Sequence, residues 1–396
     1  MKALVLMLAL GGCSWTTFSD LSDSTWVHAQ ETPDSDQSNY AVAIVNSTTD
    51  QPGELAVLSG TPANYSTLDF DPSGSTSETL TQPLGQHSIS TLSNHPAFVG
   101  DGSGNVAVVD KGIDGPLVVI HGTANQLTDS QLSSTDPVDA ATFSASDIIV
   151  ASSGMTPASG KPNAWLVQAS VTNCALVDES GTMPMAAAAL ASDGTNVYAY
   201  SRTGEFLVYT RADFEDPSKC GNTQTPPPLA PNAHVMTTAP AANGGYIGLV
   251  GSSFAILVAF DSPSSTAGAV TVVSLGATPA QVGTSIATAG VEAAQLGTFG
   301  EAGTGMPTLA LGFPSRTVGT TTDVGEVELH AVDTTGGAVS GDAAETLSIP
   351  QADADLVFGR GLAAMTYNGS TILVVAASNV VYAYYETMLY SDTRQQ

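Results

Sequence analysis

The sequence predicts an all-β protein, and within that class a seven-bladed β-propeller with about four antiparallel strands per blade. Short runs of β-branched and aromatic residues alternate with Gly, Asn, Asp, Ser and Pro, and no long segment has the 3.6-residue period of an amphipathic helix. The runs come in pairs that recur about every 50 to 63 residues, close to the period of propeller repeats. A pair of β-sandwiches would not give this regular pattern, and a β-helix would repeat at shorter periods.

The paired runs are predicted to form seven hairpins. In chain order they are Tyr40–Val45 with Glu54–Leu58, Ala97–Val99 with Asn105–Asp110, Asp147–Ala151 with Ala164–Ala169, Asn196–Tyr200 with Glu205–Thr210, Tyr246–Val250 with Phe254–Phe260, Thr308–Gly312 with Glu326–Val332, and Thr371–Ala377 with Val380–Tyr385. Weaker apolar runs flank most pairs: Ser88–Leu92, Ala140–Phe143, Met185–Leu190 and Gly361–Met365 before them, and Leu117–Ile120, Ala175–Val177, Val270–Leu275 and Glu345–Ile349 after them. These flanking runs bring each unit to about four strands.

Closing the ring requires a further strand, because an open sheet edge invites aggregation. The last unit ends near Tyr385, and the first unit has no obvious strand before it. We expect Thr25–Gln30 (TWVHAQ) to complete the last blade, with Glu386–Ser391 as the competing segment.

The N-terminus reads MKALVLMLALGGC, which combines one positive residue, a short apolar run and small residues before a cysteine. A membrane-spanning helix needs about 20 apolar residues, so this run is too short to be one. Leu10-Gly11-Gly12-Cys13 resembles the lipobox of bacterial lipoprotein signals. The resemblance implies cleavage before Cys13 and attachment of a palmitate-bearing lipid to that residue; the alternative is an ordinary signal peptide that contains a cysteine.

The expected organisation therefore has three parts: a signal peptide (1–12), an acidic polar tether (13–39, of which 25–30 closes the ring) and the propeller (40–391). The formal net charge of −28 repels nucleic acid and anionic lipid headgroups, so membrane attachment has to come from the lipid. The expected location is the cell envelope, at the outer membrane, because Ser14 is not the aspartate associated with inner-membrane retention.

If Cys13 carries the lipid, Cys174 and Cys220 remain as an even pair, which predicts a disulfide in an oxidising compartment. The alternative is two buried free thiols. Neither cysteine has the spacing of a metal site.

Units six and seven resemble the FG-GAP repeats of the integrin alpha-chain propeller. The resemblance rests on Phe358-Gly359 followed by Asn368-Gly369-Ser370, Ile372–Ala377 and Val380-Val381-Tyr382, and on Phe299-Gly300 followed by Leu309–Pro314 and Gly325-Glu326-Val327. It implies a non-catalytic propeller for adhesion or ligand binding.

FG-GAP repeats often carry a calcium loop with aspartates at alternate positions, because a hard cation needs clustered oxygen ligands. Asn368-Gly369-Ser370 has no aspartate. Asp101 stands alone in its loop, and Asp69 and Asp71 alternate correctly but precede Pro72 without a third ligand. Hairpin turns are the alternative for both segments, so the sequence predicts no metal and no cofactor, and leaves Asp69, Asp71 and Asp101 as weak calcium candidates.

No catalytic motif stands out. The six histidines are scattered without HExxH or ligand spacing, and neither a Gly-x-Ser-x-Gly elbow nor a Walker loop occurs. Catalytic groups of a propeller can converge at its axis from distant blades, so an enzyme is disfavoured but stays open. The Pro-rich segment Thr225–Pro231 is expected to be a stiff loop between units four and five, the alternative being a polyproline ligand.

The function expected from these observations is a lipid-anchored, non-catalytic scaffold that binds a protein or a glycan at the envelope. Two alternatives remain: an exported lactonase- or hydrolase-like propeller enzyme that uses axial acids and histidines, and a structural subunit of an outer-membrane assembly machine. A metal held by three or more converging ligands at the axial mouth would favour the enzyme.

Overall fold

A computed structural model describes residues 26–31, 39–46, 53–59, 64–70, 79–83, 97–109, 118–121, 138–145, 147–152, 161–168, 170–223, 225–261, 268–299, 307–348, 357–367, 370–378 and 380–384. The strands in these residues fall into seven sheets, here called sheets I to VII in chain order. Nearly every pairing between neighbouring strands is antiparallel, as the predicted hairpins require, so the chain is an all-β protein.

The first four sheets are as follows. Sheet I holds β2 (Asn39–Asn46), β3 (Gly53–Ser59), β4 (Asn64–Phe70) and β5 (Thr79–Pro83), and sheet II holds β6 (Ala97–Gly100), β7 (Val106–Val109) and β8 (Val118–His121). Sheet III holds β9 (Val138–Ser144), β10 (Asp147–Ser152), β11 (Ala164–Val167), β12 (Val171–Leu176) and β16 (Pro228–Leu229), and sheet IV holds β13 (Ala187–Ser192), β14 (Asn196–Ser201), β15 (Glu205–Thr210) and β17 (Ala233–Met236).

The remaining sheets complete the set. Sheet V holds β18 (Gly245–Val250), β19 (Phe254–Ala259), β20 (Ala269–Ser274) and β21 (Ala280–Ala287). Sheet VI holds β22 (Ala293–Gly297), β23 (Thr308–Phe313), β24 (Glu326–Asp333), β25 (Ala338–Val339) and β26 (Glu345–Leu347), and sheet VII holds β27 (Gly361–Tyr367), β28 (Ser370–Ala376), β29 (Val380–Tyr384) and β1 (Trp26–Glu31).

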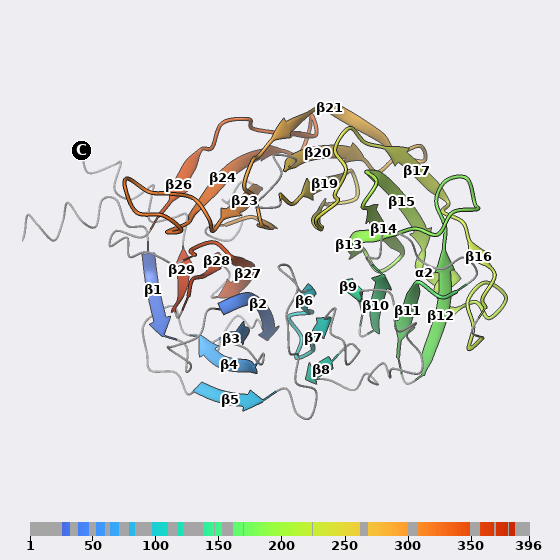
Figure 1. Cartoon of the computed structure of the whole chain (residues 1–396), viewed down its shortest axis with the longest axis horizontal. Coiled ribbons are helices and arrows are strands. Elements are labelled where there is room, and N and C mark those ends of the chain that lie inside the picture. The colour runs from blue at the N-terminus through green and yellow to red at the C-terminus, as the bar shows by residue number, and fades with distance from the viewer. Residues whose placement is uncertain are drawn as a thin grey trace, which may run out of the picture.

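The seven sheets stand in a ring around a central axis (Figure 1). The strand of each sheet nearest the axis, here called its inner strand, is β2, β6, β9, β13, β18, β22 or β27. The inner strands contact one another in sequence, β2 with β6, β6 with β9, β9 with β13, β13 with β18, β18 with β22, β22 with β27, and β27 with β2. The last contact returns to the first sheet, so the ring is closed.

Closure of sheet VII uses the segment that the sequence predicted. Strand β1 pairs antiparallel with β29 from Glu31 opposite Val380 to Trp26 opposite Tyr384, and the two strands lie side by side in Figure 1. The first strand of the chain thereby covers the edge of the last sheet. The competing segment, Glu386–Ser391, lies outside the described residues.

Apolar clusters fill the seams between neighbouring sheets. Ile149 and Leu166 of sheet III pack with Val197 and Leu207 of sheet IV, and equivalent clusters lie at the other seams. The side chains involved are mainly Val, Ile, Leu and Ala, and most of them are fully buried. Burial of both faces of each sheet explains why the strands are continuous apolar runs with weak alternation.

All seven predicted hairpins form, but they do not occupy equivalent places. In sheets I, II and V the hairpin consists of the two innermost strands. In sheets III, IV, VI and VII it consists of the second and third strands.

A crossover insertion, residues 211–232, separates β15 from β17 and reaches back to sheet III. It begins with the helix α2 (Arg211–Glu215), which buries Phe214 edge-on against Tyr209. It ends with β16, which pairs parallel with β12. The Pro-rich segment Thr225–Pro231 therefore lies in the connection between the third and fourth strands of sheet IV. The prediction that it joins units four and five was wrong, because the fourth strand of sheet IV begins only at Ala233, after the insertion.

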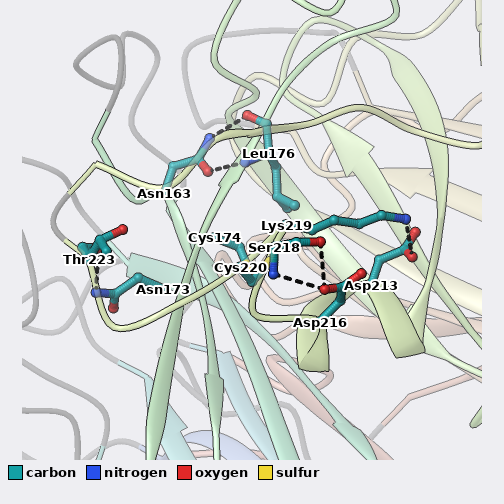
Figure 2. The surroundings of a disulfide bond; sticks show 10 residues. All are labelled: Asn163, Asn173, Cys174, Leu176, Asp213, Asp216, Ser218, Lys219, Cys220 and Thr223. Atoms are coloured by element: carbon teal, nitrogen blue, oxygen red, sulfur yellow. Dashed lines mark hydrogen bonds and ion pairs between the residues drawn. A yellow bond between two sulfur atoms is a disulfide. The ribbon is translucent and has the colours of Figure 1, made fainter.

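The disulfide between Cys174 of β12 and Cys220 of the crossover insertion ties this insertion to sheet III (Figure 2). Around it, the backbones of Asn173 and Gly221 exchange two hydrogen bonds of 2.9 and 3.0 Å. The Asn173 Nδ2 donates to the carbonyl oxygen of Thr223 over 3.0 Å. The pairing predicted from the cysteine count is thus present, and it ties the connection between β15 and β17 of sheet IV to sheet III.

Candidate functional site

A central cavity of about 1320 Å³ runs along the axis of the ring. The seven inner strands supply its wall, and many of their lining residues are small, including Ala188, Ala189 and Ala191 of β13 and Ala293 and Ala294 of β22. Small side chains are required here because the strands converge on the axis. The wall itself therefore offers little chemistry, and the polar residues of the cavity gather toward its mouths.

Among the residues that the structure describes, one mouth carries four charged side chains, here called the charged mouth: Arg202, Asp261, Glu292 and Arg360. Each follows the second strand of its sheet or precedes the first strand. In an antiparallel sheet these two positions lie at the same end, so the four residues from sheets IV to VII share one opening. The opening therefore holds two cations and two carboxylates, in a chain with 9 Lys and Arg in total.

Hydrogen bonds orient three of the four side chains of the charged mouth. The Arg202 Nη1 donates to the carbonyl oxygen of Ala242 over 2.9 Å. The Gly290 N–H donates to Asp261 Oδ2 over 2.8 Å, and the Ser315 hydroxyl donates to Glu292 Oε1 over 3.1 Å. Burial raises the pKa of Glu292, and the hydrogen bond from Ser315 and the charge of Arg360 oppose that rise.

Asp101 lies in the turn between β6 and β7, at the other end of the cavity. Its Oδ1 accepts hydrogen bonds from the N–H groups of Ser103 and Asn105 over 2.8 and 3.0 Å. Its Oδ2 accepts one from Asn105 Nδ2 over 2.5 Å. Both carboxylate oxygens thus serve the turn itself, which agrees with the hairpin-turn alternative to a calcium loop.

Three further predicted site residues are Asp69, Asp71 and Cys13. Asp69 lies on β4, opposite Glu54 of β3, but its side chain is outside the described part of the structure. Asp71 and Cys13 lie outside the described residues, so calcium binding by the first and lipidation of the second stay predictions. No helix in the described residues is long and apolar enough to cross a membrane.

The Phe-Gly pairs of the FG-GAP resemblance are not at equivalent positions. Phe358 precedes the inner strand of sheet VII, whereas Phe299 follows the inner strand of sheet VI. Both rings are fully buried in the same cluster between these two sheets. Their shared role is therefore to fill one seam, and the structure does not support a true repeat of this motif.

Sequence reasoning missed a second group of side chains, here called the Glu–Glu–His cluster: Glu179, Glu205 and His234. One ligand-type atom from each lies within 4.8 Å of the others. The three come from the loop after β12, the start of β15 and β17, so no local spacing in the sequence could reveal them. Only the strand pairing of β15 with β17 across the crossover insertion brings the histidine to the acids.

Comparison with known proteins places the fold without naming a family. No model of a protein family matches the sequence, and no curated protein matches it. A chain in a structure titled "Crystal Structure of Mitotic Checkpoint Complex" is similar, with a TM-score of 0.52 and 10% identity over 92% of this chain and 95% of that one. The WD40 β-propeller domain of Doa1 gives a TM-score of 0.48 and 10% identity over 91% and 96%. At such identities the likeness concerns the fold alone, and the fold of this chain is a β-propeller.

Proposed function

We propose that this protein is a lipid-anchored, exported, seven-bladed propeller that acts as a non-catalytic scaffold for a protein partner. The observation that carries the binding role is the charged mouth, where Arg202 and Arg360 line the axial opening in a chain of net charge −28. Two arginines beside two acids at one opening give a partner that carries charged side chains of both signs a specific place to dock. A similar solved structure is titled as a complex, which supports a role in protein interaction.

The anchor is the second part of the proposal. It rests on the lipobox-like segment Leu10-Gly11-Gly12-Cys13 and on the acidic surface, which gives no electrostatic attraction to a membrane. We expect the full chain, produced in a bacterium, to partition into the detergent phase of a Triton X-114 extract. The Cys13→Ala variant is expected in the aqueous phase, and equal partitioning of both would refute the anchor.

The binding role is tested by crosslinking and affinity purification of the full chain from envelope extracts. The Arg202→Ala/Arg360→Ala variant is expected to lose the crosslinked partner. The control is Lys219→Ala, which removes an exposed cation that pairs with Asp213 on the crossover insertion, away from the residues that line the cavity. Equal recovery of the partner by wild type and by the double variant would rule out the charged mouth as its site.

Adhesion to a protein or glycan is one specific form of this function, and it rests on the sequence resemblance to FG-GAP repeats alone. A subunit role in an outer-membrane assembly machine predicts a different result in the same purification. A stoichiometric complex of envelope proteins would favour the machine, whereas a single exterior ligand would favour adhesion. Protease treatment of intact cells would distinguish the two faces of the membrane.

A further inference from the structure

The Glu–Glu–His cluster lies at the seam between sheets III and IV. In the register of β15 and β17, His234 is opposite Leu207 and Met236 is opposite Glu205. Opposed residues and residues two apart share a face of a sheet, so Glu205 and His234 project from the same face. Leu207 on that face packs into the cluster that contains Cys174 of sheet III.

Glu179 reaches the same place from the connection between the two sheets. Its N–H donates to Glu205 Oε1 over 3.0 Å, and its Oε2 lies 2.7 Å from His234 Nδ1. The loop that carries it is closed on itself, because the Asp178 N–H donates to the carbonyl oxygen of Met183 over 2.9 Å. The Glu179 backbone is therefore held against the first residue of β15.

Glu205 is the buried member of the cluster. Its side chain is 4% exposed, whereas those of Glu179 and His234 are about half exposed. Only Oε1 accepts a hydrogen bond within the described part of the chain, from Glu179, so Oε2 has no donor there. A largely buried carboxylate is costly to ionise unless a cation or hydrogen-bond donors compensate its charge.

Most of the charged groups near Glu205 are negative and disfavour its ionised form. Burial raises its pKa, the hydrogen bond from the Glu179 N–H lowers it, the charges of Glu179 and Asp178 raise it, and His234 lowers it. Two carboxylates, Glu179 and Glu205, thus face one imidazole, whose Nδ1 is 4.0 Å from Glu205 Oε1. His234 and the Glu179 N–H offset part of the negative charge of the cluster, and the remaining negative charge favours a bound cation.

We propose that Glu179, Glu205 and His234 bind a divalent transition-metal ion, with Zn²⁺ as the best fit. Two carboxylate oxygens and one imidazole nitrogen are a zinc-type ligand set, and three protein ligands leave a coordination position open for water or a partner. Calcium fits poorly because it prefers an all-oxygen shell. Ligand atoms within 4.8 Å of one another can converge on one ion at about 2.0–2.2 Å with small side-chain movements.

No residue of the cluster lines the axial cavity, although Arg202 of the charged mouth and Glu205 belong to the same hairpin of β14 and β15. The site would connect sheet III to sheet IV near the disulfide, and its open position makes it a point at which a partner's own ligand can join.

The test is titration of the full chain with Zn²⁺ by calorimetry, with excess Mg²⁺ present to occupy adventitious acidic sites. We expect one Zn²⁺ per chain, and at least about a tenfold weaker affinity in His234→Ala and in Glu179→Gln. Glu179 is half exposed, so its substitution preserves folding even if the histidine variant misfolds. Glu215→Gln is the control, since it removes a surface carboxylate that pairs with Arg211 on the neighbouring insertion.

Co²⁺ provides an independent readout. Its visible absorption reports the ligand field, and we expect a spectrum that disappears in His234→Ala and persists in Glu215→Gln. If wild type takes up no Zn²⁺ beyond what Mg²⁺ displaces, or if both cluster variants bind it as tightly as wild type, the cluster is an imidazole–carboxylate pair only and the proposal is overturned.

Discussion

Gly312 of β23 lies directly against Gly359, the residue that leads into sheet VII. A Cβ atom at Gly312 would overlap the carbonyl oxygen of Gly359, and Gly359 itself has a φ of +88°. The two sheets approach so closely at this point that neither backbone leaves room for a side chain. Gly359 is fixed to its own sheet, because its N–H donates to the carbonyl oxygen of Ala376 of β28 over 3.1 Å.

We predict that Gly312→Ala destabilises the protein by about 1–3 kcal/mol, because the added methyl group must push two backbones apart. Gly276→Ala is the matched control, since a Cβ there would meet no atom within 4 Å. Urea denaturation of both variants measures the difference. Equal midpoints for the two variants would show that the seam between sheets VI and VII has room for a methyl group at position 312.

Removing the disulfide is expected to cost about 4 kcal/mol, because Cys174 and Cys220 are 46 residues apart and the link restricts the unfolded chain. The change is Cys174→Ala/Cys220→Ala, measured by urea denaturation. Dithiothreitol should lower the midpoint of wild type and leave that of the double variant unchanged. If dithiothreitol leaves the urea midpoint of wild type unchanged, the disulfide does not stabilise the protein.

Deletion of residues 24–30 removes most of β1 and exposes the edge of β29. The ladder joins five residue pairs, so we expect a loss on the order of 3 kcal/mol and a concentration-dependent dimer through the bare edge. Calorimetry and size-exclusion chromatography report the two effects. Deletion of residues 14–20 serves as the control, and an unchanged melting temperature after removal of 24–30 would mean that another segment closes sheet VII.

Glu205 predicts a pH dependence of stability. Because its pKa is raised in the folded protein above the ordinary 4.5, its ionisation opposes folding at neutral pH, and this penalty is lost as the pH falls below about 4.5. In the presence of a chelator we expect Glu205→Gln to be more stable than wild type at pH 7, by an amount on the order of 1 kcal/mol.

The amide oxygen that Glu205→Gln introduces can still accept the Glu179 N–H, so the change removes charge and little else. Thermal unfolding between pH 4 and pH 8 measures the difference. The prediction fails if the gap between the variant and wild type stays constant over that range, because a pure packing effect has no pH dependence.

The strands could be predicted because their chemistry is local. Tyr246–Val250 and Phe254–Phe260 are β-branched and aromatic runs separated by a turn, and they form β18 and β19 almost residue for residue. Whether such a pair is the inner or the middle hairpin of its sheet depends on the partners across the seams. Hydrophobic patterning does not carry that information, because both faces are buried.

The crossover insertion and the Glu–Glu–His cluster escaped the sequence for a related reason. The helix Arg211–Glu215 is a single turn anchored by Phe214, too short for a periodic signal. His234 meets Glu205 only because β17 returns to β15 after this insertion. The charged mouth likewise assembles Arg202 and Arg360 from sheets that are distant in the sequence.

The pairing of β1 with β29 also constrains the order of folding events. The segment Trp26–Glu31 is synthesised well before its partner Val380–Tyr384, because six complete sheets lie between them in the sequence. Contacts between such distant segments form slowly, because a long loop must close before the pairing contributes. The ring can therefore lock only after nearly the whole chain has emerged, and until then both the early strand and the late edge depend on chaperones or rapid folding to avoid pairing with other chains.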